Sequence, residues 1–202
     1  ILETMKNSDF STSLIQILEN GIGEVLGDHY LYSCGDKEKS SKPISVFESE
    51  TLNLLFANNG DFEKKFGIRG ALGVSTRIGE ASQKSFLRLK GNDYNFDTIE
   101  FRLLNTTKRY LCGFEKLSEF ISDNSPWRIN VINNSSEWIW QVVDDNDRFL
   151  LNEFWGAFFK GFIKEYLSWN SGGRFFIMNS HVFDDELSNI FQISINKKPL
   201  GN

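Results

Sequence analysis

Side chains suited to nucleophilic chemistry or metal binding are scarce in this chain. Its 202 residues include two cysteines and two histidines. Cys34 and Cys112 lie far apart and form no CxxC pair, which argues against a disulfide framework or a zinc ribbon. His29 and His181 provide no HExxH motif and no multi-histidine cluster, and the sequence lacks a GxSxG elbow and a Walker motif. We therefore expect no catalytic residue and no enzymatic activity.

An excess of positive charge and a long apolar run are also missing. The net charge is −5 and the sequence pI is about 5.2, so a nucleic-acid partner is not expected. No apolar run reaches the roughly 18–20 residues that a membrane span needs. The first residues, ILETMKNSDF, have no basic segment followed by an apolar one, so they do not resemble a secretion signal. A reducing cytoplasm is the default location.

Apolar residues recur at helical spacing over much of the chain. This spacing predicts helices over residues 9–27, 46–58, 61–91, 108–123 and 149–169. Ser11 or Thr12 can cap the first of them. The third contains four glycines, which we interpret as allowing a close approach to another element: Gly67, Gly70, Gly73 and Gly79.

Two segments alternate apolar and polar residues with the period of a strand. Residues 127–133 and 137–145 form one predicted hairpin, and residues 174–181 and 190–197 form a second, with a turn over 183–189. The predicted fold is therefore α+β, with an antiparallel sheet of about four strands packed against helices and a helical N-terminal half. We expect a helical extension over residues 1–60 and a ligand-binding domain over residues 61–202, or one continuous domain.

Acidic residues gather at two places, Asp144 to Asp147 and Asp184 to Glu186. Carboxylates of this kind can hold a hard cation or act as an acid–base pair. Neither run has the spacing of a calcium loop. We interpret the first as facing the positive end of the 149–169 helix, and the second as a solvated turn.

Aromatic residues are abundant, with 19 phenylalanines and five tryptophans. They fill a core in most proteins. They can also line an apolar ligand pocket between the sheet and the 149–169 helix. The candidate lining residues are Trp127, Trp138, Trp140, Phe159 and Phe162.

Several segments together resemble the vinyl-4-reductase (4VR) domain family, which is described as predicted hydrocarbon-binding proteins. The matching segments are GIRGALGVSTRIGEAS (67–82), FRLL (101–104), LCGFEKLSEF (111–120), WIW (138–140), GAFFKGFIKEYLSWNSGG (156–173) and FFIMNSHVFDDELSNIFQISINKKP (175–199). The resemblance implies the α+β fold shared with TRAPP subunits, binding of a hydrophobic small molecule, and a dimer.

The resemblance also implies where zinc ligands would stand in those members of the family that bind zinc. Those positions are occupied by Met178, His181 and Asn189, and the segment after the first hairpin reads DDND over residues 144–147. One histidine without a thiolate is a poor zinc site. We therefore expect no metal and no cofactor other than an unidentified hydrophobic ligand.

Three functions compete on these grounds. The first is a non-enzymatic sensor or carrier for an aromatic, lipid or tetrapyrrole-like molecule, present as a homodimer or with a protein partner. The second is a protein–protein interaction module whose pocket is filled by side chains. The third, implied by the family name alone, is an accessory factor in tetrapyrrole metabolism of the chlorophyll type.

Overall fold

The computed structural model describes residues 10–27, 56, 60–144, 151–185 and 188–201, without the side chains of 184, 185, 188 and 189. The described helices are α1 (Thr12–Leu26), α4 (Asp61–Lys90), α5 (Ile99–Leu103), α6 (Thr106–Asn124) and α7 (Glu153–Ser171). The described strands are β1 (Trp127–Asn133), β2 (Glu137–Asp144), β3 (Phe176–Asp185) and β4 (Ser188–Pro199). The α+β prediction is confirmed, whereas α5 was not predicted and the expected helix over 46–58 lies outside the described residues apart from Phe56.

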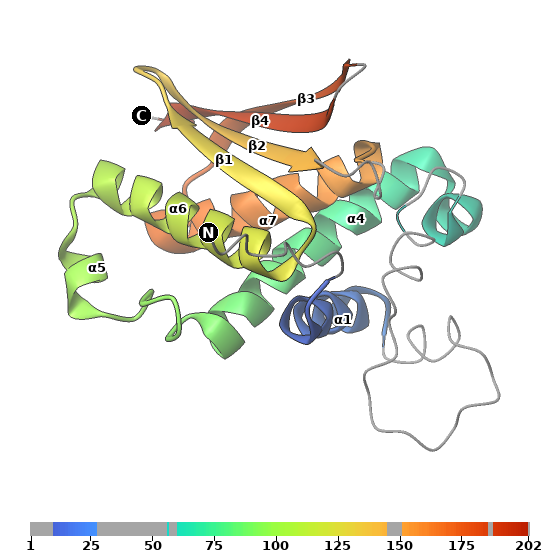
Figure 1. Ribbon diagram of the computed structural model, residues 1–202, viewed down its shortest axis with the longest axis horizontal. Coiled ribbons are helices and arrows are strands. Elements are labelled where there is room, and N and C mark those ends of the chain that lie inside the picture. Colours follow the sequence, from blue (N-terminus) through green and yellow to red (C-terminus); the bar gives the residue numbers. More distant parts are fainter. Residues whose placement is uncertain (1–9, 28–55, 57–59, 145–150, 186–187, 202) are drawn as a thin grey trace, which may run out of the picture.

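The four strands form one antiparallel sheet in the order β1-β2-β4-β3. Both predicted hairpins are present, and they are joined where β2 pairs with β4. Figure 1 shows the sheet above a layer formed by α6 and α7, with α4 and α1 beneath α7. The helix between the two hairpins therefore covers one face of the sheet, as its position in the sequence predicts.

The turn of the second hairpin is tighter than the sequence suggested. The ladder between β3 and β4 continues through the pairs Asp184–Asn189 and Asp185–Ser188. Both aspartates therefore belong to a strand and not to a long solvated turn. Aspartate, serine and asparagine are frequent in turns, so the composition of residues 183–189 favoured a loop. These residue types can also adopt extended geometry, and pairing with the opposite strand extends β3 to Asp185 and lets β4 begin at Ser188.

Helix α7 begins four residues later than predicted. Asn152 caps it: the backbone N–H groups of Phe154 and Trp155 donate to Asn152 Oδ1 at 3.0 and 3.1 Å. Asp144 does not face this helix end from a loop, because it is a buried residue of β2. Residues 145–147, the rest of that acidic run, lie outside the described residues.

Helices α4 and α7 cross with their backbones in close contact. A Cβ atom at Gly79 would clash with the carbonyl of Phe158, and one at Gly161 would clash with the carbonyl of Thr76. The predicted close approach is therefore real, but it involves Gly79 and not Gly73, which has no neighbour within 4 Å. Gly67 adopts φ 68° and bends α4 near its start.

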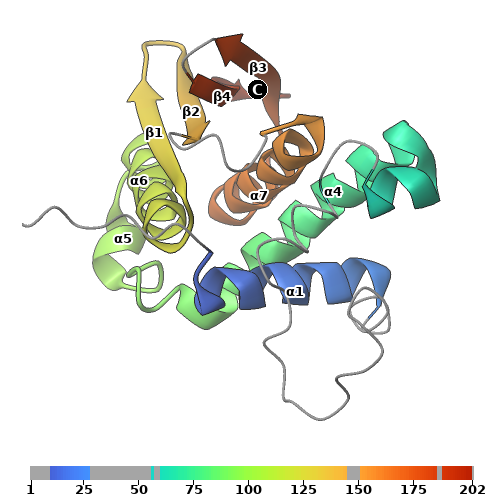
Figure 2. The ribbon, with the colours of Figure 1, turned by 45° about the vertical axis from the view of Figure 1, so that its right-hand side comes forward.

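Helix α1 is part of the packed structure. It begins after Ser11, whose Oγ accepts from the backbone N–H of Leu14 at 3.2 Å, and so confirms one of the two predicted caps. It packs against α4, and Figure 2 shows the two helices next to each other. Whether residues 1–60 form a separate extension or part of one domain stays a prediction. No described helix is long and apolar enough to cross a membrane.

Candidate functional site under the sheet

The five predicted lining residues all lie in the interior. Each has a relative exposure of 1%. Trp127 comes from β1, Trp138 and Trp140 come from β2, and Phe159 and Phe162 come from α7. Their burial agrees with both the core and the pocket interpretations, so their contact with a ligand stays a prediction.

These residues belong to one core but differ in the rings that they contact directly. Trp127 contacts Phe159 and Trp155, with centroids 5.3 and 4.7 Å apart. Phe162 instead contacts Phe158 at 6.0 Å and Phe86 at 6.3 Å. The structure therefore brings Trp127 and Phe159 into direct contact, and it links Phe162 to them through Phe158, whose ring lies 5.4 Å from that of Phe159.

Trp138 and Trp140 share another set of ring contacts beneath the sheet. They are two residues apart on β2 and therefore point to the same face. Both contact the ring of Phe114 on α6, at 5.6 and 6.1 Å. Trp138 also contacts Tyr110 and Phe176. We call the space around these five rings the sub-sheet site.

Two donors in the sub-sheet site have no acceptor. The Nε1–H groups of Trp138 and Trp140 are buried and have no hydrogen-bond partner among the described residues. An unpaired buried donor costs about 1–3 kcal/mol, so native proteins usually satisfy it with water or a ligand. Two such donors on one face of β2 make the sub-sheet site a candidate for binding a polar atom of a ligand. Ser75, Ser82 and Gln83 of α4 also have buried polar atoms without a partner among the described residues.

A polar network closes the site at the α6–α7 contact. The hydroxyl of Tyr166 on α7 donates toward the carbonyls of Arg109 and Tyr110 on α6, at 3.0 and 3.1 Å. Asn170 Nδ2 donates to this hydroxyl at 2.9 Å. The phenol fits here because Gly113 has no side chain, and a Cβ would clash with the Tyr166 hydroxyl. Sequence reasoning missed Tyr166 and Gly113, since their pairing depends on the docking of α7.

The buried Tyr166 phenol predicts a loss of stability at alkaline pH. Burial, first among the causes, raises its pKa well above the usual 10.0. Below pH 10 the phenol is protonated in both the folded and the unfolded state, so its full contribution to stability is present. Above pH 10 the unfolded chain loses this proton and the folded chain keeps it, so the free energy of unfolding falls as pH rises.

Urea unfolding of Tyr166→Phe tests this sign. At neutral pH the variant should be less stable by about 1 kcal/mol, because its hydrogen bonds are lost. Above pH 10 the wild type should lose stability more steeply than the variant. All other titrating groups are common to both proteins, so identical pH slopes would contradict the assignment.

A small groove reaches the surface beside the sub-sheet site. It has a volume of about 240 Å³ and lies between α7 and the start of β3. Leu167 and Ser168 line it from α7, and Arg174, Phe176 and Met178 line it from the β3 side. Phe176 also contacts Trp138, with centroids 6.5 Å apart. Phe176 therefore both lines the groove and contacts the ring of Trp138.

A larger pocket of about 410 Å³ lies where α4, α6 and the first turn of α1 meet. Its two lysines already have partners within the protein. Lys90 Nζ lies 3.3 Å from Asp93 Oδ2, and Lys116 Nζ donates to the Tyr94 carbonyl at 2.8 Å. Because its cations are already engaged within the protein, we consider it a weaker candidate than the sub-sheet site.

Few described side chains are placed to hold a metal or the iron of a cofactor. No group of three or more histidines, cysteines, aspartates or glutamates occurs among the described residues. Cys112 on α6 is half-buried, and burial raises the pKa of its thiol, which disfavours the thiolate that binds metals. The Tyr166 hydroxyl is already hydrogen-bonded. His29 lies outside the described residues.

The three positions implied for zinc ligands do not converge. Met178 pairs with Ile195 and points to the helix side of the sheet, whereas His181, three residues later, points to the other side and is exposed. Asn189 lies on β4, and its side chain is not described. Absence of a metal stays a prediction for the whole chain.

Comparisons with known proteins identify the fold. No family model matches the chain, and no curated protein does. Solved structures do match. An oxygen-binding H-NOX domain related to soluble guanylate cyclases, in its oxygen complex, has a TM-score of 0.57 and 14% identity over 95% of this chain and 97% of that one. A mutant H-NOX domain of T. tengcongensis has a TM-score of 0.60 and 13% identity over 94% and 99%.

These matches correct the family resemblance drawn from the sequence. The structural neighbours are H-NOX domains and not vinyl-4-reductase or TRAPP-like proteins, so the assignment to hydrocarbon-binding proteins is wrong. The segments that suggested it were glycine spacings and hairpin signals, which report close helix contacts and turns. Such features recur in unrelated α+β folds and do not identify a family.

The expectation of no cofactor is corrected by the same comparison. One matching structure, with a TM-score of 0.58, 14% identity and coverage of 92% and 99%, concerns haem redox potential and porphyrin distortion. Haem iron needs an axial histidine, cysteine, methionine or tyrosine. The Tyr166 hydroxyl beside the sub-sheet site is engaged in hydrogen bonds, so it does not fit the role of an axial ligand to a haem iron. At this level of identity the likeness establishes one thing: the chain has the fold of H-NOX domains.

Proposed function

We propose that this chain is a non-catalytic sensor domain that binds one small molecule in the sub-sheet site. The fold supports this proposal, since the matched H-NOX structures are described in terms of oxygen binding, haem and activation. The observation that carries it is the pair of buried indole N–H groups of Trp138 and Trp140, which have no acceptor among the described residues.

The chemistry of the site narrows the ligand. Its walls are aromatic, and the indole N–H groups that have no partner in the described part of the chain are donors. A matching ligand has an apolar body and at least one oxygen or nitrogen acceptor, because small-molecule sites combine mostly apolar walls with a few oriented polar groups. A pure hydrocarbon lacks such an acceptor, whereas molecules with carbonyl or carboxylate groups have one.

The groove beside Phe176 supports a route of entry. Rotation of the Phe176 ring would join the groove to the space around Trp138. In this proposal ligand binding displaces Phe176. Because Phe176 is the first residue of β3, this displacement changes the position of the strand's start and so transmits ligand binding to the sheet.

Native mass spectrometry of the full chain, purified without a denaturing step, tests the proposal. We expect a mass above the covalent mass by one discrete small molecule, whose own mass and absorption identify its class. Trp140→Phe keeps an aromatic ring, although a smaller one, and removes the donor, so occupancy should fall at least about tenfold, the effect of about 1.4 kcal/mol.

Trp169→Phe is the matched control, because Trp169 is 42% exposed and lies outside the sub-sheet site. It should leave occupancy unchanged. If Trp140→Phe and Trp169→Phe behave alike, or if the wild type carries no added mass, the proposal is contradicted. Circular dichroism of each variant separates lost binding from lost folding.

A further inference from the structure

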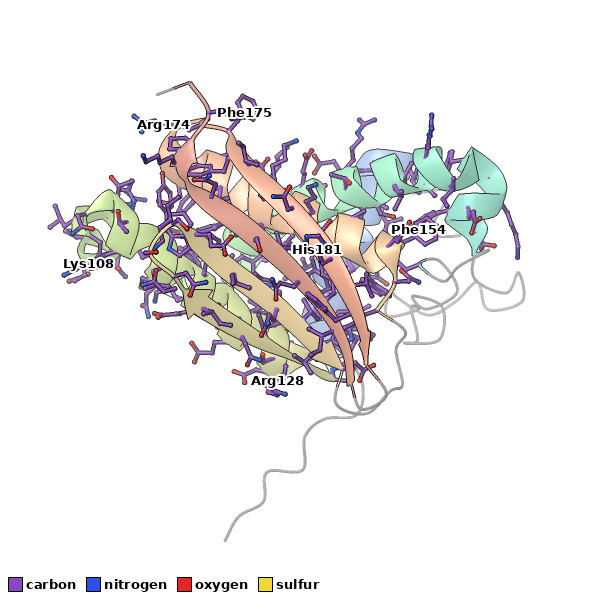
Figure 3. The ribbon with its side chains drawn as sticks, turned by 90° about the horizontal axis from the view of Figure 1, so that it is seen from above. Lys108, Arg128, Phe154, Arg174, Phe175 and His181 are labelled. Atoms are coloured by element: carbon purple, nitrogen blue, oxygen red, sulfur yellow. The ribbon has the colours of Figure 1, made fainter. Side chains whose placement is uncertain are left out.

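Strand β3 forms a rim of the sheet, and its outer edge has no strand partner among the described residues. The sheet order places β1 and β3 at the two rims. Figure 3 shows the strand that carries His181 along one rim, with β1, which carries Arg128, at the other. An exposed edge presents a row of backbone N–H and C=O groups that can pair with another strand.

The two rims differ in how they are protected. Helix α6 packs against β1, and the backbone N–H of Ile129 donates to Ser122 Oγ on α6 at 2.9 Å. Strand β3 has no lysine and no proline over residues 176–185, although monomeric proteins commonly use these residues to block edges. Ile177, Val182 and Phe183 are 45%, 43% and 46% exposed.

The faces of β3 follow from its register with β4. Met178, Ser180 and Val182 pair with buried residues of β4 and so face the helices. Ile177, Asn179, His181 and Phe183 therefore face the other side. The ring contact of His181 with Phe183, at 6.3 Å, agrees with this alternation.

We propose that two copies of the chain dimerise by antiparallel pairing of their β3 strands, centred on Ser180. In a two-fold pair that keeps the helices of both copies on one side, residues pair only with residues of the same face. Centring on Ser180 places Ile177 opposite Phe183 of the second copy, and Met178 opposite Val182 of the second copy.

The neighbouring registers are less complementary. Centring on Asn179 places Ile177 opposite His181, and centring on His181 places Asn179 opposite Phe183. Apolar cross-strand pairs stabilise a sheet, whereas apolar–polar pairs do so less. Ser180 is thus the centre, among these three, that matches apolar with apolar residues on both faces. The apolar residues of β3 are therefore complementary to those of another β3 strand, so we infer that the partner is a second copy of the chain.

Sedimentation equilibrium of the full chain over a wide concentration range tests the dimer. The wild type should fit a monomer–dimer equilibrium. Ile177→Lys and Phe183→Glu should each weaken association at least about tenfold, a cost of about 1.4 kcal/mol or more. Ile132→Lys is the matched control, since Ile132 is 40% exposed on the opposite rim, and it should leave association unchanged.

The double variant Ile177→Lys/Phe183→Glu tests the register. In the proposed dimer each lysine lies opposite a glutamate of the other copy, so the double variant should associate more tightly than either single variant. This outcome also shows that the substituted chains fold. A wild type that stays monomeric at all concentrations, or a double variant weaker than both single variants, would overturn the proposal.

Discussion

Gly161→Ala should lower the free energy of unfolding by about 3 kcal/mol, although alanine is the better helix former. The added methyl group would overlap the carbonyl of Thr76 on α4. Because the obstructing atom belongs to the backbone, no side chain can rotate away, and the two helices must separate. Gly79→Ala should act in the same way, since its Cβ would meet the backbone of α7 at Phe158.

The matched control is Gly73→Ala on α4. Gly73 is helical and exposed, and it has no atom within 4 Å of the added Cβ. Its substitution should stabilise the protein by up to about 1 kcal/mol. Thermal unfolding gives the measurement, because 3 kcal/mol corresponds to a fall in Tm of about 6–12 °C for a chain of this size. Equal effects at Gly161 and Gly73 would show that the helices do not cross at their glycines.

Trp155→Ala should be the most destabilising of the aromatic truncations, at about 4 kcal/mol. Trp155 is 1% exposed and joins segments distant in the sequence. Its ring contacts Phe10 before α1, Phe56, and Trp127 of β1. Truncation leaves a cavity that these rings cannot fill together, because each is fixed by other contacts.

The same variant tests the division of the chain into an N-terminal extension and a ligand-binding domain. If Phe10 and α1 unfold with the rest, circular dichroism and tryptophan fluorescence should report one shifted transition. Trp169→Ala is the control, since Trp169 is 42% exposed and should cost less than half as much. Two separated transitions in the wild type would favour an independent extension.

Local patterns predicted the elements well and their partners poorly. Alternation along Trp127–Asn133 and the helical spacing of residues 149–169 identified a strand and a helix, because each pattern depends on neighbours a few residues away. The order β1-β2-β4-β3 and the start of α7 at Glu153 depend on tertiary packing and on the Asn152 cap.

The burial of the candidate site residues was predictable for the same reason, whereas their contact with a ligand stays a prediction. An aromatic residue on the inner face of a strand is expected to be buried, and all five candidates are buried. That Trp138 and Trp140 lack acceptors, and that Gly113 makes room for Tyr166, depends on which helix lies opposite. The glycines of α4 show what local spacing cannot predict. Their spacing indicated a close approach to another element, but it did not show that Gly79, and not Gly70 or Gly73, makes the contact with α7.

The pairing of β2 with β4 also limits where the chain can be truncated without exposing an interior strand of the sheet. Each hairpin closes through contacts between residues close in sequence, but β2 becomes an interior strand only after α7 and the second hairpin have been synthesised. A chain ending before β3 would leave β2 as an uncovered rim, with Trp138 and Trp140 lacking the strand beside them. Such a fragment, whether nascent or produced by proteolysis, should be prone to aggregation, so the last hairpin protects the rest of the sheet during folding.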